Sequence, residues 1–193
     1  YSSARNAYIV PRMKRMMNRT VWAMTKQLRK GSFKPEGYEV SFGSGKIDRI
    51  DTCETEDQVY VKILDYKTGA KSFDMAAFYH GLQMQLVVYM EEAVRLEERK
   101  HPGKKIVPAG IFYYRMKDPI VGKELDEEKL EEAILKELRL DGIIRQEDAV
   151  IQRLDADFSG NSLVIPVGKT KSGYSKASKM LLPEEFDAVL TYA

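Results

Sequence analysis

Residues 45–69, GKIDRIDTCETEDQVYVKILDYKTG, carry the clearest structural pattern of the chain. The stretch contains two apolar runs, residues 46–53 and 58–66, separated by the acidic loop ETED, and this pattern is typical of a β-hairpin. A third apolar run, YEVSFG at residues 38–43, comes just before it and predicts another strand. Strands this close in sequence can be joined by short hairpins, so we expect a three-stranded antiparallel unit.

The segments on either side of this unit have helical periodicity. Residues 8–30 carry apolar residues three or four positions apart, which predicts a helix with one apolar stripe, ended by Gly31. Residues 74–99 predict a long helix with Asp74 as its N-cap, and a buried strand follows at residues 106–116. The order strand, helix, strand requires a crossover, and a crossover joins parallel strands. The predicted class is therefore α/β, with a mixed sheet flanked by helices.

The rest of the chain adds a second layer of detail. Residues 126–139 predict an acidic amphipathic helix. The tail, residues 151–193, holds the apolar run SLVIPVG, which predicts a short strand, then the polar loop GKTKSGYSKASKM and a helix beginning near Pro183. We expect a single domain over residues 1–193, with a core of about residues 8–150 and the tail as a C-terminal extension.

Composition narrows the class of protein. No apolar run approaches the ~18 residues of a membrane span, so we expect a cytoplasmic protein without a membrane partner. The chain starts at Tyr1, and we expect it to be part of a larger protein. Residues 1–35 contain nine Lys or Arg and no Asp or Glu. These side chains either lie on a solvated helix face or bind phosphate. The charge pattern by itself favours the solvated face.

Charged residues inside the hairpin point to chemistry. Side chains alternate along a strand, so Asp65 and Lys67 project from the same face. Asp48 lies on the neighbouring strand, and the two carboxylates can meet near one end of the sheet. Such a pair repels unless a cation lies between, and Mg²⁺ prefers oxygen ligands. With Lys67 beside it to act on a metal-bound water or on phosphate, the group suits metal-assisted phosphodiester hydrolysis. The alternative is a surface ion pair in a common DYK string.

The predicted helix at residues 74–99 carries a second polar pair. Gln85 and Tyr89 are one turn apart and therefore share a face. A glutamine in the apolar run LQMQLVVYM is unfavourable if it is buried without a partner. The pair therefore joins the acids and the lysine as a candidate for function.

Together, GKIDRID, LDYKTG and YHGLQMQLVVYM resemble the RecB-like branch of the PD-(D/E)xK nuclease superfamily. More narrowly, the chain is similar to the C-terminal nuclease domain of the AddB-type subunits of AddAB (RexAB) ATP-dependent helicase–nucleases. The similarity continues through FDMAAFYHGLQMQL, PAGIFYYRMKDPIV and IPVGKTKSGYSKASK, and so covers most of the chain. It implies a restriction-endonuclease-like sheet with an αβββαβ core.

The resemblance also implies roles for the polar residues of the hairpin. Asp48 and Asp65 match the two acids that bind the metal, and the backbone carbonyl of Tyr66 matches a further ligand. Lys67 matches the catalytic lysine. The implied metal is Mg²⁺, for which Mn²⁺ can substitute.

Three more residues receive roles in the same way. Gln85 and Tyr89 match the QxxxY motif of this branch, which lies at the active site, so both are predicted to act in catalysis and to contact DNA. Gln83 has no tyrosine four residues later and is not preferred. Arg49 is predicted to pair with an acid or with a phosphate of DNA.

The function that follows is a Mg²⁺-dependent DNA exonuclease domain of a helicase–nuclease. Such enzymes process double-strand breaks for recombinational repair. The implied partners are the A subunit of the helicase–nuclease and a single strand of DNA from an unwound duplex. The alternative is a catalytically silent module with a nuclease-like fold that binds DNA or another protein of the complex.

The chain departs from this family in two ways. The family takes another metal ligand, His or Glu, from a helix before the first core strand, and residues 1–35 have none. Either that ligand precedes Tyr1, or Glu36 or Glu39 replaces it. The AddB-type subunits also hold a 4Fe–4S cluster through four cysteines, and this chain has only Cys53. We therefore expect a cluster in the parent protein and weak or no cleavage by this piece alone.

Overall fold

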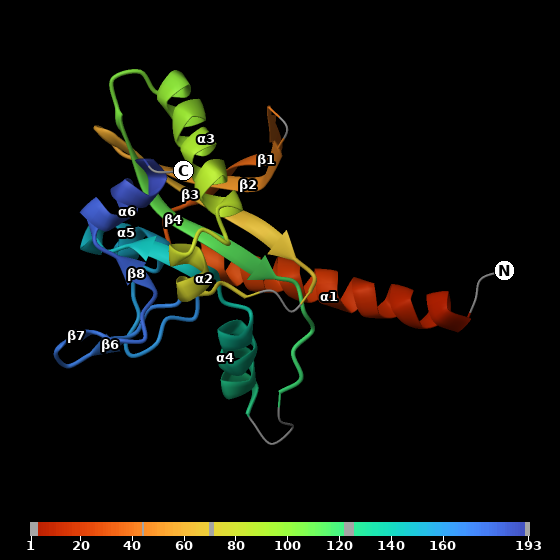
Figure 1. The fold of residues 1–193 in the computed structure, drawn as a ribbon. Coiled ribbons are helices and arrows are strands. Elements are labelled where there is room, and N and C mark those ends of the chain that lie inside the picture. Colours follow the sequence, from red (N-terminus) through yellow and green to blue (C-terminus); the bar gives the residue numbers. More distant parts are fainter. Residues whose placement is uncertain (1–3, 44, 70–71, 122–125, 192–193) are drawn as a thin grey trace.

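The fold is built around one mixed β-sheet with helices on both of its faces (Figure 1). The computed structural model describes residues 4–43, 45–69, 72–121 and 126–191. Within these ranges the elements follow in the order α1 (Ala4–Leu28), β1 (Lys34–Phe42), β2 (Gly45–Glu54), β3 (Gln58–Lys67), α2 (Met75–Tyr79), α3 (Gln85–Lys100), β4 (Lys105–Arg115), α4 (Glu127–Glu137), β5 (Asp141–Arg145), α5 (Asp148–Leu154), β6 (Lys169–Thr170), β7 (Gly173–Tyr174), β8 (Met180–Leu181) and α6 (Pro183–Thr191).

The strand order confirms the predicted sheet. Across the sheet the order is β1-β2-β3-β4-β5-β8, with β6 and β7 forming a separate hairpin. The pairs β1–β2 and β2–β3 are antiparallel, and β3–β4 is parallel through the crossover that carries α2 and α3. β4 and β5 are antiparallel, and β8 joins β5 as a parallel edge strand. The αβββαβ core is thus present, and two further strands extend it.

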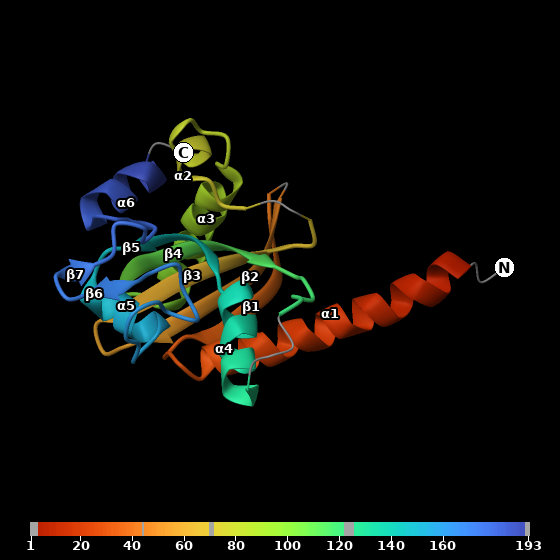
Figure 2. The same ribbon diagram turned by 90° about the horizontal axis from the view of Figure 1, so that it is seen from below.

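Two apolar cores lie on the two faces of the sheet. Figure 2 shows α2, α3 and α6 on one face and α1, α4 and α5 on the other. Ile63 and Ile111 belong to the core under α2, α3 and α6, whereas their neighbours Leu64 and Phe112 belong to the opposite core. Because successive side chains of a strand point to opposite faces, the nearly continuous apolar runs of β3 and β4 serve both cores.

The long helix predicted over residues 74–99 is interrupted. Asp74 caps α2, as predicted, by accepting a hydrogen bond from the backbone N–H of Ala77. The chain leaves the helix at Gly81, whose φ of +74° belongs to the left-handed region that glycine adopts without strain. α3 then begins at Gln85. The prediction of one uninterrupted helix is therefore wrong. The apolar residues keep helical spacing across residues 80–84, so the spacing does not reveal the break that Gly81 allows.

The C-terminal part differs most from the predictions. The strand predicted at SLVIPVG is wrong, since these residues form a bend in which Ser162 Oγ accepts hydrogen bonds from the N–H groups of Val164 and Ile165. The hydroxyl of Ser162 also donates to the buried carboxylate of Asp155, at 2.7 Å. β5 was not predicted, because DGIIR is too short to show a period. Gly142 lets it approach β4, since a Cβ there would lie 1.9 Å from the carbonyl oxygen of Ile111.

Helix α1 packs on the sheet only through its C-terminal half. Figures 1 and 2 show its N-terminal half extending away from the body of the protein. Along this half the predicted apolar stripe is exposed at Met13 and Met17, whereas Ala23 is fully buried. No helix within the described residues is both long enough and apolar enough to cross a membrane.

Candidate active site

Strand pairing brings the two predicted acids to one place. The register of β2 and β3 pairs Arg49 with Leu64, so Asp48 and Asp65 face each other on adjacent strands. The register of β3 and β4 pairs Asp65 with Tyr113. Paired residues point to the same face, here the face that α2, α3 and α6 cover.

Hydrogen bonds and an ion pair hold these side chains. The backbone N–H of Tyr66 donates to Asp48 Oδ2 at 2.8 Å. The ammonium of Lys67 pairs with Asp65 Oδ2 and lies 5.4 Å from the centre of the Tyr113 ring. The side chain of Asp65 is only 5% exposed, whereas that of Lys67 is 23% exposed and open to solvent on one side. The structure therefore brings Asp48, Asp65 and Lys67 together as the sequence predicted.

The electrostatics of this group favour a cation. Burial raises the pKa of Asp48, the Tyr66 N–H opposes this effect, and the negative charges of Asp65 and Glu39 raise the pKa further. Burial tends to lower the pKa of Lys67, but the hydrogen bond and charge of Asp65 outweigh it, and the net shift is upward. Lys67 therefore stays protonated near neutral pH, which suits it to stabilising negative charge rather than to removing a proton.

The donor set fits a hard divalent ion. Asp48, Asp65 and the carbonyl of Tyr66 offer oxygen ligands. Burial first, and then the charges of Asp65 and Glu39, raise the pKa of Asp48, and a cation would relieve that repulsion. Among the described residues, no group of three or more Asp, Glu, His or Cys side chains could hold a metal. Two carboxylates are nevertheless an ordinary set for Mg²⁺, which completes its coordination with water and phosphate oxygens.

The two acids predicted as an extra ligand lie in different places. The carboxylate of Glu36 pairs with Lys100, the last residue of α3, at 3.2 Å. Glu39 lies opposite Asp48 in the β1–β2 register, and its charge raises the pKa of Asp48. Its carboxylate pairs with Lys46. Of the two, Glu39 is the one that lies close to the candidate site.

The predicted polar pair of α3 is present as a pair. Gln85 Nε2 donates to the hydroxyl of Tyr89 at 2.6 Å, and the Tyr89 ring packs edge-on against Phe42 with centroids 5.6 Å apart. Gln85 is exposed, which leaves the amide accessible to a ligand. Gln83 is buried, and its amide donates to the carbonyl of Ser72. The roles of Gln85 and Tyr89 in catalysis and DNA contact stay predictions.

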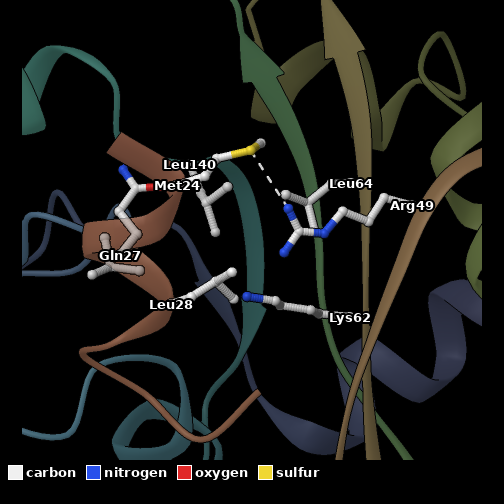
Figure 3. A pocket seen from close by; sticks show the side chains of 8 residues that line it. Met24, Gln27, Leu28, Arg49, Lys62, Leu64 and Leu140 are labelled. Carbon is white, nitrogen blue, oxygen red and sulfur yellow. Dashed lines mark hydrogen bonds between the residues drawn. The ribbon is translucent and has the colours of Figure 1, made fainter. Parts of the chain in front are cut away.

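Arg49 does not join this group. It lies on the opposite face of β2, beside residues of α1 (Figure 3). Its side chain is 5% exposed. Its guanidinium binds both carboxylate oxygens of Asp51, which also pairs with Lys62 at 3.3 Å. Burial lowers the pKa of Lys62 against the attraction of Asp51. Of the two partners predicted for Arg49, the structure contains the acid. Its contact with DNA stays a prediction, and its position on the opposite face of the sheet does not favour that contact.

Tyr113 is a site residue for which the sequence offered no signal. It lies in the apolar run of β4, where a buried tyrosine is ordinary. Only the strand register shows that it lies next to Asp65 and beside Lys67.

A comparison with known proteins identifies the family of the chain. The sequence profile of the PD-(D/E)XK nuclease superfamily matches residues 1–162. The chain belongs to this superfamily. The matched range contains the αβββαβ core and the group of Asp48, Asp65 and Lys67, and residues 163–193 follow it.

Relatives with assigned names narrow the comparison. The chain is similar to proteins named as the B subunit of an ATP-dependent helicase/deoxyribonuclease, from Lachnoclostridium phytofermentans, Alkaliphilus metalliredigens and Clostridium acetobutylicum. The identities are 38%, 36% and 35% over 209, 214 and 213 aligned positions, each covering 99% of this chain. The chain spans 18% of the length of each of these relatives.

Proposed function

We propose that this chain is a nuclease domain that hydrolyses phosphodiester bonds of DNA. The observation that carries the proposal is the pair of facing carboxylates, Asp48 and Asp65, with a protonated Lys67 on the same face. Asp65 is buried and Asp48 is partly buried. Two such acids of like charge cost stability unless they serve a ligand, which is common at functional sites.

Each residue has a role in this proposal. Asp48, Asp65 and the Tyr66 carbonyl would hold Mg²⁺, or Mn²⁺ in its place, and the bound ion would polarise the phosphate and lower the pKa of a water. Lys67, oriented by Asp65, stabilises the negative charge that develops on the phosphate. Gln85 and Tyr89 are proposed to contact the DNA strand.

The names of the relatives suggest the wider setting. We propose that the chain is the exonuclease part of a longer AddB-type protein, which works with a helicase–nuclease A subunit in the cytoplasm. The substrate is a single strand from a duplex that the ATP-dependent complex unwinds, and the process is the repair of double-strand breaks. The 4Fe–4S cluster that the resemblance implies would be held by cysteines of the longer protein outside this chain. Cys53 is the chain's single cysteine, and it is buried in the sheet.

A cleavage assay tests the proposal. End-labelled single-stranded DNA is incubated with the chain in Mg²⁺, in Mn²⁺ and in EDTA, and cleavage is expected only with metal. Lys67→Met should lower the rate by about 10²–10³-fold, the usual effect of removing a group that stabilises the transition state. Lys105→Met is the matched control, because Lys105 is exposed at the opposite end of the same sheet. A Lys67→Met variant that cleaves DNA at the rate of the unsubstituted chain would contradict the role assigned to Lys67.

A second candidate function is a silent module that binds DNA. It is favoured by the small donor set, since no group of three metal-binding side chains occurs in the part of the chain that the structure describes. Binding of labelled DNA in EDTA, together with intact DNA after prolonged incubation in Mn²⁺, would support the silent module. Slow, metal-dependent cleavage supports the nuclease, and slow is what we expect from this piece without its helicase.

A further inference from the structure

The C-terminal tail meets the sheet beside the candidate active site. Lys179, the residue before β8, extends its ammonium to Asp141 Oδ1 at 2.6 Å. Asp141 pairs with Tyr113 in the register of β5 and β4, and Tyr113 pairs with Asp65 in the register of β4 and β3. Asp141, Tyr113 and Asp65 thus form one row across neighbouring strands. Lys179 lies in residues 163–193, which follow the part of the chain matched by the superfamily.

Lys179 and Asp141 together bind the backbone of Phe73. The Lys179 ammonium donates to the Phe73 carbonyl at 2.9 Å, and the Phe73 N–H donates to Asp141 Oδ2 at 2.9 Å. Phe73 belongs to no helix or strand, so these side chains replace the partners that regular structure would provide. Hydrogen bonds to charged groups are stronger than neutral ones, and the bond from Lys179 connects positions 106 residues apart in the sequence.

Phe73 packs against both α2 and the Tyr113 ring on β4. It is 3% exposed, and its ring lies 5.3 Å from that of Phe78 in α2 and 6.3 Å from that of Tyr113. The ammonium of Lys67 also lies near the Tyr113 ring, 5.4 Å from its centre. Phe73 also comes just before α2, in the connection from β3 to the helix with Gln85. A shift of Phe73 would therefore move both the wall beside Lys67 and the start of the helices.

We propose that Lys179 and Asp141 are positioning residues of the nuclease site. By fixing Phe73, they set the geometry between Lys67 on β3 and the polar pair on α3. The C-terminal tail is then a working part of the active site and not only an extension of the sheet. This inference rests on the proposed nuclease function, and its test separates the two.

The first measurement is kinetic. Lys179→Met should lower kcat for single-stranded DNA by about 10–100-fold and leave KM nearly unchanged, because misplacing reacting groups slows the chemical step. Lys179→Arg should keep most of the original kcat, since a guanidinium can donate to both the Phe73 carbonyl and Asp141 Oδ1. Lys176→Met is the matched control, because Lys176 is exposed in the same loop. A Lys179→Met variant with parental kcat overturns the proposal.

The second measurement needs neither metal nor DNA. Amide hydrogen exchange of residues 72–84 should be about tenfold faster in Lys179→Met than in the parent, with exchange in α1 unchanged. Faster exchange everywhere with a lower melting temperature would show a purely structural role and overturn the proposal. If the chain without substitutions does not cleave DNA at all, the proposed function fails. The rate of local amide exchange then decides by itself whether Lys179 positions residues 72–84.

Discussion

At the scale of single residues, the candidate site is a balance of unfavourable charges. Asp48 is partly buried beside Asp65 and opposite Glu39, and the Tyr66 N–H and the charge of Lys67 compensate in part. Burial and repulsion raise the pKa of Asp48 above its ordinary value of 3.8. Such electrostatic destabilisation is tolerated at sites where it serves ligand binding. Removing the charge of Asp48 should therefore stabilise the fold.

Asp48→Asn should raise the melting temperature at pH 7 in metal-free buffer. An acid whose pKa is raised on folding stabilises the fold when protonated, and this contribution is lost as the pH rises from 3.8 through the raised pKa. Asparagine carries no charge and can still accept the Tyr66 N–H. The advantage of the variant should therefore shrink as the pH falls toward 3.8.

Thermal unfolding across pH measures this difference, with Asp57→Asn as the control because Asp57 is exposed. Adding Mg²⁺ should stabilise the parent more than the variant, because only the parent keeps both carboxylates. An Asp48→Asn protein less stable than the parent at every pH would contradict the account.

At the scale of elements, the break between α2 and α3 separates two glutamines by function. Gln83 lies in the break and is buried, and it binds the segment before α2. Gln85 begins α3 and is exposed beside Tyr89. An uninterrupted helix would have placed the two residues about 200° apart around one axis, with no such difference in bonding.

Gln83→Ala should therefore lower the stability of the fold, whereas Gln85→Ala should lower DNA cleavage. Gln83→Ala removes hydrogen bonds to Ser72 and Asp74 and should cost about 1–3 kcal/mol in the free energy of unfolding. Gln85→Ala should change it by less than about 0.5 kcal/mol, as is usual at an exposed position, and should impair DNA cleavage. Tyr89→Phe keeps the ring contact and should resemble Gln85→Ala. Urea unfolding and the cleavage assay measure both quantities, and a stable, fully active Gln85→Ala protein would remove this residue from the site.

At the scale of the whole molecule, residues 163–193 complete the cores on both faces of the sheet. Residues 163–193 supply β8 at the edge of the sheet and α6 over one face. They also supply buried apolar side chains to the two cores: Val164, Ile165, Val167, Leu181 and Phe186. The first half of α1, in contrast, leaves Tyr8 and Met13 at least half exposed.

Two deletions test this contrast. Removing residues 163–193 should abolish cooperative unfolding, because burial of each such side chain contributes about 1.5–3 kcal/mol and a domain has only about 5–15 kcal/mol in total. Removing residues 1–14 should change the melting temperature little. Circular dichroism during heating distinguishes the two, and a cooperative transition in the protein without its tail would show that the matched part folds alone.

Local sequence predicted strands β1 to β4 of the sheet and the chemistry of the hairpin formed by β2 and β3. The apolar runs of β2, β3 and β4, the crossover between them and the positions of Asp48, Asp65 and Lys67 all follow from period and spacing along the chain. The resemblance to a family, and not the pattern, singled out Gln85 over Gln83.

Tertiary structure alone decided which residues face one another. It placed Arg49 against Asp51 on the opposite face, brought Glu39 rather than Glu36 next to Asp48, and set Tyr113 beside Lys67. It also joined Lys179 to Phe73 across 106 residues of sequence. The physical reason is that strand register and the packing of distant segments depend on the whole set of buried contacts, whereas periodicity records only which side of its own element a residue takes.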